Sequence, residues 1–327
     1  MTNAHPTLRT GAAPAAARPL RTGRRSRARA GRAPWEEPPT VVGQTAKGIT
    51  LTGVLAVVVV PLWIITLTSF STPGAVNRAG GLVIWPDGLS TEAYRQMLGD
   101  GTVRTALMVS LGITVVGTLV SMVVSVLCAY GLSRSRSLGH RTILGLLIVT
   151  MFVSGGLIPS FLVVTGLGGY GQWWSLILPS AVSVFNILVL RSFYSTTSGD
   201  LIDAARIDGA GDWRILWSVV LPTSRAVTAV IALFYAVGYW NSFFNVMLYL
   251  PTDAQKWPLQ YVLLTYVNRG NGLPGSVNSG FGSSHAQTAP LSLQMAVVVL
   301  TLVPLLLVYP FMQKHFRAGV LTGAIKG

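Results

Sequence analysis

One segment of the chain, residues 200–222, concentrates charged side chains of both signs within an otherwise very apolar sequence. Carboxylates and guanidinium groups make charge-assisted hydrogen bonds, so a cluster of both suits contact with another polar surface. The charged residues of the segment are Asp200, Asp203, Asp208, Asp212, Arg206 and Arg214. We interpret the segment as a surface that another protein binds.

Two short helices are predicted to present these side chains. Asp200 can cap the first helix, because a side-chain oxygen at that position accepts a hydrogen bond from an unpaired backbone N–H. Gly209 then ends this helix, since glycine enters left-handed backbone geometry without steric cost. Asp212 can cap the second helix, on which Trp213 and Trp217 lie four residues apart on one face.

The same segment resembles a known family motif. The pattern Glu-Ala-Ala-x3-Gly-x9-Ile-x-Leu-Pro is typical of the cytoplasmic coupling loop in permease subunits of binding-protein-dependent ABC importers. The matching residues are Ala204, Ala205, Gly209, Leu221 and Pro222. Asp203 stands where the family has Glu, which keeps the charge on a shorter side chain. Val219 replaces the Ile, and Ala226 stands where many members have a second Pro.

The resemblance implies that the segment contacts an ATP-hydrolysing partner subunit. The residues expected at that contact are Asp203, Ala204, Ala205, Asp208, Gly209, Ala210 and Trp213. Asp203 either accepts hydrogen bonds from the partner or pairs only with Arg206. Trp213 and Trp217 either bury apolar area against the partner or lie in the membrane interface, where tryptophan is common.

The composition favours a membrane protein over a large soluble α/β protein. Hydrophobic residues make up 51% of the 327 residues and charged residues 10%, against roughly 25% charged in soluble domains. Several apolar runs exceed the roughly 18 residues that span a bilayer. The predicted spans are residues 48–69, 105–131, 143–165, 172–193, 224–248 and 290–312. The sequence Ser154-Gly-Gly-Leu-Ile-Pro159 is expected to bend or interrupt the third span.

The net charge of +14 comes mainly from the N-terminal segment. Residues 1–46 are predicted to be a disordered basic cytosolic tail, preceding a transmembrane domain over 47–327 with its coupling loop at 194–223. The tail lacks the interleaved aromatic residues typical of nucleic-acid binding, which we therefore do not expect. Nineteen of the 24 Lys and Arg residues lie in the two termini, the coupling loop with its flanks (Arg191 to Arg225) and the loop at 132–142. The positive-inside rule then places both termini and the coupling loop in the cytosol.

Several catalytic and carrier classes are disfavoured by the sequence. It has no Gly-x4-Gly-Lys-Ser/Thr phosphate-binding loop, so we expect no cofactor here and assign ATP and Mg²⁺ to partner subunits. The single cysteine, Cys128, indicates neither a disulfide nor a metal site. The predicted spans hold ionisable groups only at their cytosolic ends, which argues against an ion-coupled secondary carrier and for a solute without strong net charge.

Polar and aromatic residues in the fifth predicted span indicate where a solute passes. A stripe at helical spacing comprises Phe234, Gly238, Asn241 and Asn245. The aromatic residues that flank it are Tyr235, Tyr239, Trp240, Phe243 and Phe244. Amides that hydrogen-bond hydroxyls, beside rings that stack on C–H faces, suit a sugar. The alternative is that the asparagines join helices and the rings fill packing gaps. Asn186 of the fourth span is a weaker candidate, for which packing is favoured.

Further motifs resemble the carbohydrate-uptake branch of this family, of the maltose-permease and polysaccharide-importer kind. They are Trp85-Pro86, Ser154–Pro159, Trp240-Asn241 and the C-terminal Gly323-Ala-Ile-Lys-Gly327. The resemblance implies an all-α integral membrane protein with six transmembrane helices, both termini cytosolic and the type I ABC importer permease fold.

It also implies a set of partners in a bacterial cell membrane. They are a homologous second permease, two ATP-binding subunits, an extracytoplasmic substrate-binding protein and membrane lipids, with sugar or oligosaccharide as the solute. Two alternatives stay open. One is the same importer class carrying a peptide, an amino acid or another polar solute. The other is an ion-coupled carrier.

Overall fold

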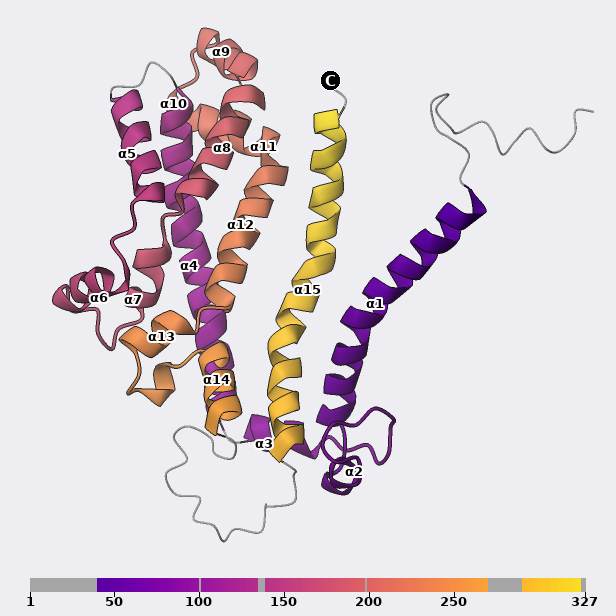
Figure 1. Ribbon diagram of the computed structural model, residues 1–327. Helices are drawn as coiled ribbons and strands as arrows, with labels where there is room; N and C mark the ends of the chain where they lie inside the picture. Colours follow the sequence, from indigo (N-terminus) through magenta and orange to yellow (C-terminus); the bar gives the residue numbers. More distant parts are fainter. Residues whose placement is uncertain (1–39, 100, 135–138, 198, 270–289, 325–327) are drawn as a thin grey trace, which may run out of the picture. The chain divides into compact units, whose positions relative to one another are not determined.

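A computed structural model describes residues 40–99, 101–134, 139–197, 199–269 and 290–324, which are almost entirely helical (Figure 1). Three helices in these ranges are long and apolar enough to cross a bilayer. They are α1 (Val41–Ser69), α4 (Thr102–Ser133) and residues Leu291–Pro310 of α15 (Pro290–Ala324). Three more candidates are helix pairs bent at a short break, so the described chain has up to six spans.

The N-terminal part of the chain, up to Val57, forms a unit separate from Val58–Gly327. Helix α1 begins at Val41, before the boundary predicted at residue 46, and ends at Ser69 as predicted. The remainder of the predicted tail, residues 1–39, lies outside the described residues.

The predicted interruption of the third span is confirmed. Helix α5 (His140–Phe152) and helix α6 (Leu157–Gly166) meet at an angle of 117°. Gly156 lies between them with φ of 81°, a conformation that glycine adopts without strain. Pro159 falls in the first turn of α6, where its missing N–H costs no hydrogen bond.

The fourth span is also broken, which the apolar run at 172–193 did not predict. Helix α7 (Trp174–Ile177) continues into a 3₁₀ turn, η1 (Leu178–Ser180), and α8 (Val184–Thr197) follows at 50°. Pro179 lies in the 3₁₀ turn at the break and has no N–H with which to continue the α-helical hydrogen bonds, while Leu178 before it keeps right-handed helical geometry.

The fifth span differs from the prediction in both its limits and its continuity. Helix α10 (Asp212–Ile215), the π-helical turn η2 (Leu216–Val220) and α11 (Leu221–Thr223) turn by 87° into α12 (Arg225–Trp240). Helix α12 ends at Trp240, eight residues before the predicted limit, so a continuous helix over 224–248 is wrong. The Asn241 side-chain amide donates to the Val237 carbonyl (2.9 Å), and such local bonds compete with helix continuation.

A short helix, α13 (Phe244–Tyr249), follows that break. The predicted loop between the fifth and sixth spans contains a 3₁₀ turn, η3 (Ala254–Lys256), and helix α14 (Leu259–Arg269). Residues 270–289 of that loop lie outside the described residues. Between the first two spans lie the short helices α2 (Pro73–Arg78) and α3 (Glu92–Gly99).

Helices α4, α8 and α12 pack side by side, and α15 packs against α12 (Figure 1). The face of α4 that meets these neighbours carries small residues at every fourth position. They are Gly117, Ser121, Ser125 and Ala129, all buried. Small side chains let helix backbones approach closely, which supports helix association in a bilayer.

Candidate functional site

The predicted coupling loop folds as two short helices joined at glycine. Helix α9 (Gly199–Ile207) carries Asp200 in its first turn, and Gly209 follows with φ of 79°. This left-handed conformation is the one expected of Gly209. Helix α10 begins at Asp212 with Gly211 as its N-cap, so the prediction that Asp212 caps it is wrong.

The outer surface of the loop is rich in exposed apolar side chains. Ile207 is 87% exposed, Trp213 65% and Trp217 66%. The Asp203 carboxylate lies 3.5 Å from the Arg206 guanidinium, in an ion pair whose partners are both exposed. Ala204, Asp208 and Gly209 are exposed, while Ala205 and Ala210 pack partly against the core. Exposed apolar side chains at these positions suit burial either against a partner protein or in the membrane interface.

An ion pair that the sequence did not predict ties the loop to the end of α4. The Asp212 carboxylate lies 2.7 Å from a guanidinium nitrogen of Arg134, and the Tyr130 hydroxyl donates to the Asp212 carbonyl (3.1 Å). Arg134 also lies over the Tyr130 ring, 4.4 Å from its centroid. The hydrogen bond from Arg134 lowers the pKa of the Asp212 carboxyl below its usual value. The four-residue spacing of Tyr130 and Arg134 is the only trace of this contact in the sequence.

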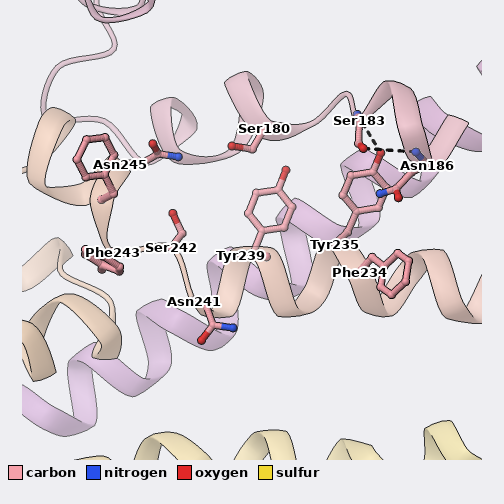
Figure 2. Close-up of a pocket in the computed structure, with 12 residues that line it drawn as sticks. Ser180, Ser183, Asn186, Phe234, Tyr235, Tyr239, Asn241, Ser242, Phe243 and Asn245 are labelled. Atoms are coloured by element: carbon pink, nitrogen blue, oxygen red, sulfur yellow. Dashed lines mark hydrogen bonds between the residues drawn. The ribbon is translucent and has the colours of Figure 1, made fainter. Parts of the chain in front are cut away.

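A pocket of about 340 Å³ lies between α12, the chain that follows it, and the break before α8 (Figure 2). Its lining consists of serines, asparagines, aromatic residues and one glycine. The lining residues are Ser180, Ser183, Asn186, Phe234, Tyr235, Gly238, Tyr239, Asn241, Ser242, Phe243, Phe244 and Asn245.

The structure brings together five of the six residues predicted to line a solute pathway. They are Phe234, Tyr239, Asn241, Asn245 and Asn186. The sixth, Trp240, does not line the pocket. It is 5% exposed, and its indole N–H donates to the Thr301 carbonyl of α15 (3.2 Å). Trp240 therefore joins two helices, which is the packing alternative for this residue.

The residues of the predicted stripe line the pocket from two helices and the break between them, and not from one continuous helix as expected. Asn241 follows the last residue of α12, and the break places Asn245 on α13 instead of on the same helix. Both still line the pocket, together with Asn186 from α8. Sequence reasoning missed Ser180, Ser183 and Ser242, because these serines line the pocket only where the two helices break.

Amides, hydroxyls and aromatic rings give this pocket a defined chemistry. Amides and hydroxyls can both donate and accept hydrogen bonds. The rings of Phe234 and Phe243 offer apolar faces beside them. Such a lining suits reversible binding of a hydroxyl-rich solute.

Residues 121–322 match the family model described as "Binding-protein-dependent transport system inner membrane component". That range covers most of the chain and contains both the coupling loop and the pocket. The chain belongs to this family. The family resemblance drawn from the motif at residues 203–222 is thereby confirmed. The chain is accordingly a multi-pass membrane permease.

Relatives of this permease cover nearly its whole transmembrane part. The polygalacturonan/rhamnogalacturonan transport system permease protein YtcP of Bacillus subtilis (strain 168) is 41% identical over 82% of this chain and 93% of YtcP. Protein LplC of the same strain is 37% identical over 85% of this chain and 92% of LplC. The diacetylchitobiose uptake permease NgcG of Streptomyces coelicolor is 28% identical over 83% of this chain and 85% of NgcG.

A solved structure has the same fold. It is the crystal structure of a bacterial ABC transporter involved in the import of the acidic polysaccharide alginate. One of its chains aligns with a TM-score of 0.77 and 27% identity, covering 87% of this permease and all of that chain.

Proposed function

We propose that this chain is the transmembrane permease subunit of an ATP-driven importer for sugar or oligosaccharide in a bacterial cytoplasmic membrane. The observation that carries the proposal is the pocket, in which amides and hydroxyls adjoin aromatic faces. The family supplies the importer class. Relatives named for polygalacturonan, diacetylchitobiose and trehalose transport support a carbohydrate cargo.

In this proposal six spans cross the membrane and both termini are cytosolic, as the distribution of basic residues predicts. The solute reaches the pocket from an extracytoplasmic binding protein. A second, homologous permease completes the passage, and two ATP-binding subunits hold ATP and Mg²⁺. This chain itself makes and breaks no covalent bond.

The coupling loop transmits the movement of the ATP-binding subunits. Ile207 and Trp213 are exposed on its outer surface, where a cleft of the partner can bury them. The Arg134–Asp212 ion pair connects the loop to α4, so displacement of the loop moves that helix. The spans then rock between an outward-open and an inward-open arrangement around the pocket.

The test is ATP hydrolysis by the full complex in lipid nanodiscs, assembled with its partner subunits and binding protein. The probes are oligogalacturonides, diacetylchitobiose, trehalose and a tripeptide, each mixed with the binding protein. We expect one or more of the sugars to stimulate hydrolysis, and complex without binding protein serves as the control. If only the tripeptide stimulated hydrolysis, the transported solute would be a peptide and not a sugar. Ionophore-sensitive uptake by the isolated chain without ATP would overturn the importer class.

A further inference from the structure

The two tyrosines of the pocket use their hydroxyl groups within the protein. The Tyr239 hydroxyl lies 3.1 Å from the Ile177 carbonyl at the end of α7 and 2.8 Å from Ser121 Oγ on α4. A carbonyl only accepts, so Tyr239 donates to Ile177 and must accept from Ser121. In a continuous helix Ile177 would bond the N–H of Ala181, which here donates to Leu178 instead. Tyr239 thus gives the Ile177 carbonyl a donor at the point where it loses its α-helical partner.

Tyr235, one helical turn earlier, bonds a backbone N–H at the other end of the break. Its hydroxyl accepts from the Ser183 backbone N–H (3.1 Å) and lies 2.7 Å from Ser125 Oγ on α4 (Figure 2 shows the contact with Ser183). Ser183 precedes α8, and its own Oγ accepts from the Asn186 N–H (3.4 Å) as an N-cap does. In the bond between Tyr235 and Ser125 either hydroxyl can be the donor.

Close packing of α4 against α12 supports these bonds. A Cβ atom at Gly117 would lie 2.8 Å from the Tyr239 ring, so only glycine fits at that position without a shift. Ser121 and Ser125 follow at four-residue intervals on the same buried face of α4. Both are fully buried, where an unpaired hydroxyl would be costly.

Four other polar side chains of the pocket have no hydrogen-bond partner among the residues that the structure describes. They are Ser180, Asn186, Ser242 and Asn245. Asn186 is only 6% exposed, yet it lines the pocket. An amide that lines a pocket and has no partner in the protein is free to bond a ligand or water. Asn241 differs, because its amide already bonds the Val237 carbonyl.

We propose that the polar groups of the pocket have two different roles. Tyr235 and Tyr239 are positioning residues that hold η1 and the break at residues 181–183 as a rigid wall. Asn186 and Asn245 are the groups that bond the hydroxyls of the solute, since each amide offers two N–H donors and an acceptor oxygen where a serine hydroxyl offers one donor. The assignment of the two asparagines rests on the proposed sugar cargo, whereas the role of the tyrosines does not.

The positioning role is tested by amide hydrogen exchange in the full complex in nanodiscs. Tyr235→Phe keeps the ring and removes the acceptor of the Ser183 N–H, so exchange in a peptide covering 178–186 should accelerate about tenfold. Tyr261→Phe is the matched control. Tyr261 is a buried tyrosine that contacts the Trp257 ring edge-on and lies outside the pocket. Equal exchange in the two variants would overturn the positioning role.

The contact role is tested by sugar retention in the complex trapped with ATP and vanadate, which removes the affinity of the binding protein from the measurement. The probe is the sugar that stimulates ATP hydrolysis in the panel above. Asn186→Ala and Asn245→Ala should each raise the half-saturating sugar concentration about two- to tenfold, with exchange at 178–186 unchanged. Retention like wild type in both variants, or accelerated exchange in Asn186→Ala, would overturn this role. A wild-type complex that responds to no sugar would instead refute the proposed cargo.

Discussion

Replacement of Gly117 by alanine tests the packing of α4 against the pocket. The added methyl group would lie 2.8–2.9 Å from three carbon atoms of the Tyr239 ring. That ring cannot easily move aside, because its hydroxyl is bonded both to Ser121 and to the Ile177 carbonyl. Gly112 provides a matched control on the same helix. It is exposed, and a Cβ there would have no neighbour within 4 Å.

The magnitudes separate the two variants. Alanine is favoured over glycine inside a helix by about 1 kcal/mol, a gain that both substitutions share. Overpacking of a filled core costs about 1–3 kcal/mol, and only Gly117→Ala incurs it. Gly112→Ala should therefore be neutral or stabilising. Gly117→Ala should be less stable than Gly112→Ala by about 1–3 kcal/mol.

Thermal unfolding of the complex in nanodiscs at one fixed heating rate provides the assay, because unfolding of large assemblies is commonly irreversible. At about 2–4 °C per kcal/mol, Gly117→Ala should unfold roughly 2–12 °C below Gly112→Ala. If the two variants unfold at the same temperature, the close contact with Tyr239 does not exist. A Tyr239→Leu background removes the ring, so Gly117→Ala should cost clearly less there.

The coupling loop yields three further predictions. Gly209→Val forces a β-branched residue into left-handed geometry at a cost of at least about 1–2 kcal/mol, so the complex should lose binding-protein-stimulated ATP hydrolysis. Gly211→Val, at φ of −69°, should retain it, and equal loss in both would exclude this cause. In a Cys128→Ser background, Ile207→Cys should cross-link to the ATP-binding subunit in a nucleotide-sensitive way. An active complex without that cross-link would show that Ile207 does not lie at the contact with the ATP-binding subunit. Asp212→Asn should lower the unfolding temperature at pH 7. The lowered pKa means that the ion pair stabilises above about pH 4 and is lost in acid, where variant and wild type should converge. A difference that does not shrink as the pH falls below about 4 would contradict this.

The length of the apolar runs and the turn chemistry predicted much of the fold. The break at Ser154–Pro159 and the left-handed Gly209 both follow from residues that act locally, through proline and glycine geometry. The breaks at Pro179 and Asn241 were not predicted. Both lie inside apolar runs of full length, and the first is stabilised by a tyrosine more than fifty residues away in the chain, which bonds Ser183.

The candidate pocket was predictable only in part, for the same reason. Asn241 and Asn245 were found because amides beside aromatic rings are conspicuous in an apolar span. Asn186 was assigned chiefly to packing, because nothing in its own span indicates a neighbouring pocket. Trp240, like Tyr239, was predicted because it is an aromatic residue beside the polar stripe, but its indole N–H bonds the Thr301 carbonyl of α15. Which side of a helix meets a pocket depends on its neighbours, and residue spacing within one helix does not encode them.

Helix α4 connects the two functional regions of this permease. Near one end Arg134 holds the coupling loop through Asp212, and thirteen residues earlier Ser121 bonds Tyr239 at the back of the pocket. At 1.5 Å per residue the two contacts are about 20 Å apart along one rigid helix. The loop also continues directly, through η2 and α11, into α12, which carries Tyr235 and Tyr239. A tilt of α4 relative to α12 would strain the serine–tyrosine bonds that hold the pocket wall. The bonds that build the pocket are thus the ones through which movement of the loop would open it.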